Sequence, residues 1–134
     1  MCTKIFPARI KLYAIINTKI DLSIKKGGMT MEYYAHTRED GERQTVKDHL
    51  VGVSKLAEDF SVDILKPLAK KASLYHDIGK YALNFQKRLD DDKVKFSHAA
   101  CGAIEYKTLA DKNDCFAPLV EYCIAGHHLS LIHI

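Results

Sequence analysis

The chain has 134 residues, of which 47% are hydrophobic and 28% charged, a composition that indicates one globular domain and excludes a disordered chain. Its apolar stretches are too short to span a membrane and its N-terminus lacks a secretion signal, so a cytoplasmic protein is expected. The chain has 20 basic and 17 acidic residues, and residues 1–28 hold six of the basic residues and one of the acidic ones. Residues 29–134 therefore hold 14 basic and 16 acidic residues, so overall charge gives no support to a nucleic-acid partner.

Residues 1–28 differ from the rest of the chain. They are rich in lysine and isoleucine and end in Lys25-Lys26-Gly27-Gly28, a run that a purine-rich ribosome-binding sequence ahead of Met31 would encode. We interpret residues 1–28 as a translated leader or disordered extension, residues 29–128 as the domain, and residues 129–134 as a non-native tail. The alternative for the first segment is a short hairpin, because its apolar runs are strand-like.

Helical periodicity begins after Thr45, which with Asp48 resembles a capping box. Apolar residues then recur at helical spacing in one stripe: Val46, Leu50, Val53, Ala57 and Phe60. A second helix is expected from Pro67, with Leu68, Ala69, Ala72 and Tyr75 facing inward and Gly79 as its stop.

A short segment with Phe85 and Leu89 precedes a solvated loop at residues 90–93. Ser97 is expected to cap a third helix, which runs to about Leu109 and carries small residues that allow close packing. Pro118 is expected to open a fourth helix with one apolar face: Val120, Cys123, Ile124 and His127. The expected fold is all-α, a bundle of about five helices that is incomplete at its C-terminus.

The four cysteines form no pair with zinc-finger spacing, so they are interpreted as free thiols. Cys101 and Cys123 are expected to be small core residues.

Five of the seven histidines lie next to helix ends or apolar stripes, where they could converge: His49, His76, His98, His127 and His128. Asp77 adjoins His76. One such histidine is usually an ordinary core residue, but five beside a carboxylate are hard to bury without a shared partner. Imidazole and carboxylate suit first-row transition metals, so the pattern favours a metal site.

The most specific segment is HDIGK, residues 76–80, and it resembles the signature of the HD superfamily of metal-dependent phosphohydrolases. Further motifs, in order over about residues 33–128, are similar to the HD nuclease domain of type I CRISPR-associated nuclease-helicases: Tyr34–Thr37, His49–Val53, Phe85-Gln86, Ser97–Ala103 and Ile124–His128.

The resemblance implies a helical fold that binds one or two divalent ions and cleaves single-stranded DNA. The metal would be manganese, magnesium, nickel, cobalt, iron or zinc. The implied ligands are His49, His76, Asp77, His98, His127 and His128. Asp77 would bridge the ions and act in catalysis, and Lys80 would neutralise phosphate charge. Implied partners are a helicase, fused or separate, and the CRISPR RNA-guided surveillance complex.

The chain departs from the family pattern in two respects, and some of its residues have alternative interpretations. The family's loop and aspartate ligand beyond the double histidine do not follow here, and no Walker-type motif occurs in the chain. Lys80 can also be read as an exposed cation at a helix end, and His36 as lining the site or capping the first helix. The competing functions are hydrolysis of a nucleotide by an HD phosphohydrolase and an inactive, metal-stabilised binding module.

Overall fold

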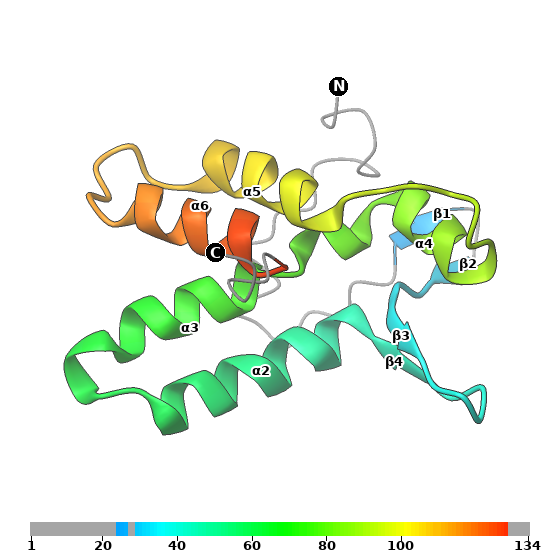
Figure 1. Ribbon diagram of the computed structural model, residues 1–134, viewed down its shortest axis with the longest axis horizontal. Helices are drawn as coiled ribbons and strands as arrows, with labels where there is room; N and C mark the ends of the chain where they lie inside the picture. The colour runs from blue at the N-terminus through cyan, green and yellow to red at the C-terminus, as the bar shows by residue number, and fades with distance from the viewer. Residues whose placement is uncertain (1–23, 27–28, 129–134) are drawn as a thin grey trace, which may run out of the picture.

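The computed structural model describes residues 24–26 and 29–128, and this part of the chain is mostly helical (Figure 1). It holds five α-helices: α2 (Val46–Phe60), α3 (Lys66–Tyr75), α4 (Leu83–Asp90), α5 (His98–Leu109) and α6 (Ala117–Gly126). Two 3-10 turns are η2 (Asp63–Leu65) and η3 (Ile78–Tyr81). Strand β1 (Ile24–Lys26) pairs antiparallel with β2 (Met29–Met31), and β3 (Tyr34–Thr37) with β4 (Arg43–Thr45). The expected class is confirmed, with two short strand pairs added.

Helices α2 and α3 form an antiparallel pair on one side of the molecule (Figure 1). The expected cap at the start of α2 is present, since the backbone N–H of Asp48 donates to Thr45 Oγ1 at 3.0 Å. Val46 and Leu50 are buried as predicted, but Phe60 is 87% exposed. The stripe prediction was wrong there because α2 continues to the tip of the pair, where the chain turns into η2 and no core remains to cover it.

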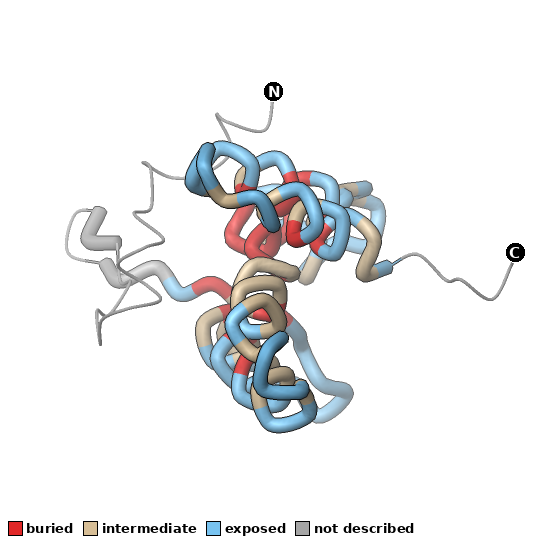
Figure 2. Tube along the Cα trace, turned by 90° about the vertical axis from the view of Figure 1, so that its left-hand side faces the viewer, coloured by how far each residue is buried: buried red, intermediate tan, exposed pale blue. Residues whose placement is uncertain are grey.

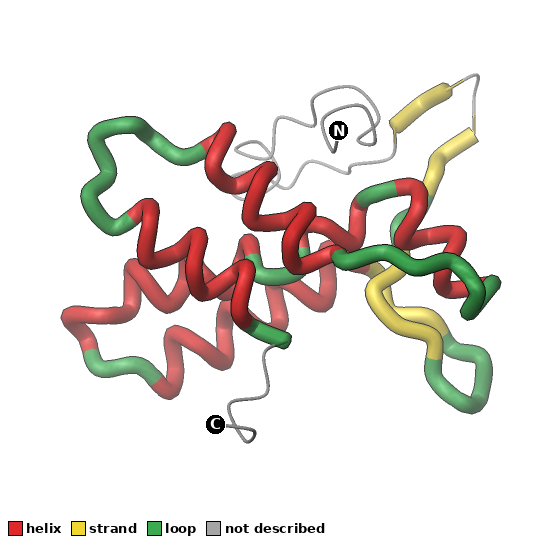
Figure 3. Tube along the Cα trace, turned by 45° about the horizontal axis from the view of Figure 1, so that its top comes forward, coloured by secondary structure: helices red, strands yellow, loops and turns green. Residues whose placement is uncertain are grey.

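Helices α5 and α6 pack against each other in a second layer (Figures 1 and 3). Ser97 caps α5 as predicted, accepting from the backbone N–H of Ala100 at 3.4 Å. Val120 and Ile124 on α6 are fully buried, whereas Cys123 between them is exposed, so only Cys101 is the core thiol that was expected. Val120 and Ile124 lie four residues apart and pack with Ala103 and Tyr106 of α5, whereas Cys123, turned by about 100° from Ile124 around the helix, is exposed.

The turn η3 connects the two layers, and all four of its residues are buried. Helix α3 already ends at Tyr75, so the prediction that Gly79 stops it was wrong. Gly79 is required for a different reason: a Cβ there would lie 1.9 Å from the carbonyl oxygen of His98. Glycine thus lets η3 approach the first turn of α5 at backbone contact.

The described part of the chain contains two small hydrophobic cores, and two residues of this turn, Ile78 and Tyr81, belong to one of them. One contains Tyr33, Ala35, Val46, Leu50, Ile78 and Tyr81. The other contains Ala103, Tyr106, Val120 and Ile124. Figure 2 shows the buried residues gathered toward the middle, where the layers meet.

Gln86 on α4 fastens β3 to this framework. Its side-chain Oε1 accepts from the backbone N–H of Tyr34 at 3.0 Å, and its Nε2 donates to the carbonyls of Tyr34 at 2.9 Å and Lys80 at 2.7 Å. These bonds hold β3, and His36 on it, beside η3.

Some predictions lie outside the described residues. These are the interpretation of residues 129–134, with His133 among them, and that of residues 1–23 and 27–28. Ile24–Lys26 pairs with Met29–Met31, whereas the strand-like runs of the hairpin alternative, residues 10–16 and 19–24, lie almost wholly outside the described residues, and the leader interpretation stays a prediction. Among the helices that the structure describes, none is long and apolar enough to cross a membrane.

Candidate metal centre

The centre of the site is the carboxylate of Asp77, which lies between α3 and η3 and is 5% exposed. Within the described residues, five side-chain nitrogens lie within 3.3 Å of it. Oδ2 faces His49 Nε2 at 2.9 Å, His76 Nε2 at 3.3 Å and Lys80 Nζ at 2.8 Å, and Oδ1 faces the Nε2 atoms of His98 and His127, both at 3.1 Å. Each carboxylate oxygen therefore has its own set of imidazoles.

These imidazoles come from both helical layers. His49 lies in the first turn of α2, His76 follows α3, His98 begins α5 and His127 follows α6. The caps at Thr45 and Ser97 fix the two helix starts, and the close contact at Gly79 brings η3 against the start of α5. Four helix ends thus converge on one carboxylate.

The rings of His76 and His127 are oriented by backbone carbonyls. Nδ1 of His76 lies 2.6 Å from the carbonyl oxygen of Ser73, and Nδ1 of His127 lies 2.7 Å from that of Ile124. A carbonyl only accepts, so each Nδ1 must carry the proton, and in the neutral ring Nε2 is then a bare lone pair. Both lone pairs face the Asp77 carboxylate, an arrangement that is repulsive unless a proton or a metal ion lies between them.

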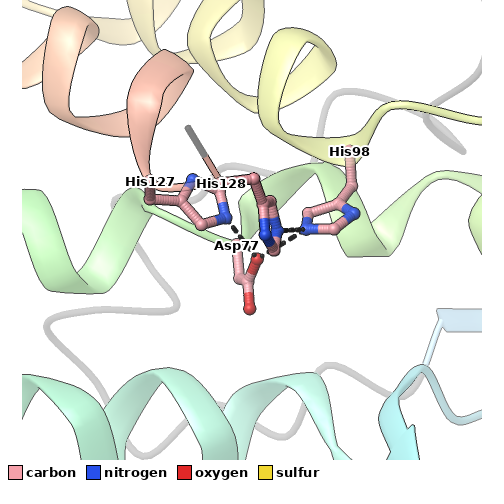
Figure 4. A group of neighbouring side chains, drawn as sticks. All are labelled: Asp77, His98, His127 and His128. Atoms are coloured by element: carbon pink, nitrogen blue, oxygen red, sulfur yellow. Dashed lines mark hydrogen bonds and ion pairs between the residues drawn. The ribbon is translucent and has the colours of Figure 1, made fainter. Parts of the chain in front are cut away.

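His128 completes the group that Figure 4 shows. Its Nε2 lies 2.6 Å from Nε2 of His98, so two imidazoles point the same kind of atom at each other. One ligand atom from each of Asp77, His98, His127 and His128 can be chosen so that all lie within 4.8 Å of one another. His128 is exposed, so this side of the group opens to the surface.

The pKa values reflect this crowding. Burial raises the pKa of Asp77, but hydrogen bonds with the surrounding histidines outweigh it and bring the pKa well below its ordinary range. The interaction with Asp77 raises the pKa of His127. Burial, and then the nearby His127 and His98, lower the pKa of His128. Asp77 is therefore held as a carboxylate at the centre of the site.

A second group lies on the other side of Asp77: His36, His49 and Asp77 also offer ligand atoms within 4.8 Å of one another. His36 lines the site, as one of its two expected roles had it. Lys80 Nζ lies 3.2 Å from His36 Nε2. Lys80 is 3% exposed, which rules out its alternative interpretation as a solvated cation at a helix end.

All six residues that the sequence indicates as ligands are brought together, namely His49, His76, Asp77, His98, His127 and His128. That they bind metal stays a prediction. Sequence reasoning missed the orienting carbonyls of Ser73 and Ile124. The signal for them was available, because a histidine just past a helix end meets the free carbonyl three residues before it.

Comparison with models of protein families gives no match, and comparisons with curated proteins and with solved structures also give none. The family resemblance therefore depends on the motifs alone.

Proposed function

We propose that this protein is a metal-dependent phosphodiesterase of the HD nuclease type that cleaves single-stranded DNA. The observation that carries the proposal is the pair of rings, His76 and His127, whose Nδ1 protons are held by backbone carbonyls while both Nε2 atoms face the Asp77 carboxylate. Metal-binding histidines are oriented in this way, with the second ring nitrogen donating to a carbonyl or carboxylate.

The donor set fits one or two divalent ions. It consists of imidazole nitrogens and one carboxylate, which suits manganese, iron, cobalt, nickel or zinc. The two candidate groups share Asp77, so its carboxylate would be a ligand in either group. A bound ion would supply the Lewis acidity that hydrolysis of a phosphodiester requires.

The chain's own residues have distinct roles in this proposal. Asp77 holds the centre anionic and fixed, because it is buried and faces imidazoles from four helix ends. Lys80 is buried 2.8 Å from Asp77 Oδ2, close enough to the centre for its charge to act on a phosphate oxygen there. His128 is the exposed member, so the substrate phosphate approaches from its side.

The test begins with metal content. Elemental analysis of the purified chain should find a transition metal, and Asp77→Asn should lose it, whereas Asp59→Asn, an exposed aspartate on α2, should keep it. Because the Asp77 variant removes a buried centre, His128→Gln serves as a second variant at an exposed position, where lowered metal content is expected with an unchanged circular-dichroism spectrum. A chain without metal, in any divalent-ion buffer, would contradict the proposal.

Circular single-stranded DNA then tests the activity, because a nucleotidase cannot open a closed circle. The wild type and Asp59→Asn should linearise it, and Asp77→Asn should not. Hydrolysis of nucleotides without opening of the circle would support the HD nucleotide phosphohydrolase instead. Bound metal with no hydrolysis of any phosphoester would support a binding module. The helicase and CRISPR surveillance complex are proposed as partners only if the circle is opened.

A further inference from the structure

Two open hollows, of about 390 and 570 Å³, lie along the segment between α4 and α5 beside the candidate metal centre, and they share Arg88, Phe96 and Ser97 as lining residues. The smaller hollow reaches His98 and His128 of the site, and the larger one reaches Asp92, Val94 and Lys95. We name this feature the Arg88–Phe96 groove. Its smaller hollow adjoins the candidate reaction centre, and its larger hollow lies beside residues 92–97.

The lining of the groove is basic and aromatic. Arg88 is exposed, and its Nη1 donates to the carbonyl of Phe96 at 2.8 Å, which fixes the guanidinium while most of its five N–H groups stay free for another acceptor. Lys95 is exposed and Phe96 half-buried. Asp92 is the acidic residue of the lining, against two basic ones.

We propose that this groove binds the nucleotides that flank the scissile phosphate of single-stranded DNA, with a base on Phe96 and backbone phosphates on Arg88 and Lys95. The inference rests on the proposed function. A fixed guanidinium and a lysine suit phosphate oxygens, and an aromatic ring beside them suits an unpaired base. Groups of both kinds beside one track are the pattern of single-strand binding.

The extent of the groove favours a polynucleotide over a mononucleotide as its ligand. A mononucleotide with its phosphate at the histidine cluster occupies the hollow that reaches His98 and His128. Lys95 lies in the second hollow and has no role for such a ligand. A chain that continues from the cluster past Phe96 uses both hollows.

Binding of fluorescein-labelled, phosphorothioate-linked oligothymidylates, measured by fluorescence anisotropy, tests this without cleavage. For the 12-mer, Lys95→Ala and Phe96→Leu should each weaken binding about tenfold, in line with the energy of one stacked base or phosphate contact. For the dimer, Lys95→Ala should change the affinity less than about twofold, since a dimer seated at the histidine cluster fills the hollow that Lys95 does not line. Asp92→Asn should tighten the 12-mer. Lys112→Ala removes an equal charge at an exposed position outside the groove and is the control.

Equal losses for dimer and 12-mer, or no loss in either variant relative to Lys112→Ala, would overturn the proposal. The proposal would also be overturned if Phe96→Leu weakened binding of a 12-base-pair duplex as much as binding of the single-stranded 12-mer, because paired bases cannot stack on Phe96. Hydrolysis of bis-p-nitrophenyl phosphate by the wild type tests the proposed function separately. If the wild type fails to hydrolyse it while 12-mer binding depends on Lys95 and Phe96, the groove stands and the catalytic proposal falls.

Discussion

Replacing Gly79 with alanine should separate the two helical layers at the candidate metal centre. The added Cβ would lie 1.9 Å from the carbonyl oxygen of His98, 2.7 Å from its carbonyl carbon and 3.0 Å from the backbone nitrogen of Gly102. All three atoms are backbone, so no side chain can rotate away. Because a Cβ is essentially never found under 3.0 Å from another atom, the start of α5 must retreat by about 1.1 Å.

That movement has two consequences of different kind. Overpacking of a core typically costs about 1 to 3 kcal/mol, and a clash with backbone belongs at the upper end, so we expect the free energy of unfolding to fall by about 3 kcal/mol. The distance between His98 Nε2 and Asp77 Oδ1, now 3.1 Å, should also lengthen beyond contact. Metal affinity should then fall by more than the loss of stability explains.

Urea unfolding followed by circular dichroism, with and without added manganese, measures both effects. Gly102→Ala is the graded control, since its Cβ would meet its neighbours at 3.2 to 3.4 Å and should cost about 1 kcal/mol. Gly52→Ala on the exposed face of α2 meets nothing within 4 Å and should stabilise by about 0.5 to 1 kcal/mol. If Gly79→Ala unfolds at the same urea concentration as Gly102→Ala, the close approach of η3 and α5 is not what positions the site.

Three further predictions concern single side chains. Gln86→Met removes the three hydrogen bonds that hold β3 against η3, so the free energy of unfolding in urea should fall by about 2 to 3 kcal/mol, and a fall under about 0.5 kcal/mol contradicts the role of Gln86. Burial, with a smaller contribution from Asp48, raises the pKa of Tyr81 to about 12, so its contribution to stability is complete below about pH 10 and is lost as pH rises toward 12. Between these pH values the melting temperature of Tyr81→Phe should therefore fall less than that of the wild type, and an identical fall would refute the raised pKa of Tyr81. The hydrogen bond from Lys71 lowers the pKa of Asp114, so this aspartate stabilises the fold above its unfolded pKa of about 4, and that stability is lost as pH falls. Asp114→Asn should flatten the dependence of unfolding free energy on pH below that value, whereas an unchanged slope would exclude the pair.

The sequence predicted those features that depend on local chemistry. The caps at Thr45 and Ser97 and the prolines near the starts of α3 and α6 mark helix ends through hydrogen bonds and ring geometry within one turn. The sequence also indicated which histidines come together, because each adjoins a helix end or an apolar stripe that faces another element.

The features that were missed depend on contacts between distant segments. The exposure of Phe60 and Cys123 is set by where the neighbouring helix ends, which a periodic pattern does not contain. The burial of Lys80 follows from η3 packing against β3 and α5. Gly79 was predicted to end a helix, whereas the structure requires it for a close backbone approach. Both roles favour glycine, so the sequence does not distinguish them.

The division of the apolar interior into two small cores has a consequence for how the protein accepts mutations. Neither core is large, and η3, which follows Asp77 and packs against α2, β3, α4 and α5, contributes Ile78 and Tyr81 to the first of them. Substitutions at core positions outside η3, such as Leu50 or Val120, change how firmly the surrounding helices pack together. Substitutions in η3 change how the layers are aligned, and so the spacing of the imidazoles. Sequence drift in this protein should therefore be tolerated at the core positions outside η3 as long as volume is conserved, while the four residues of η3 admit almost none.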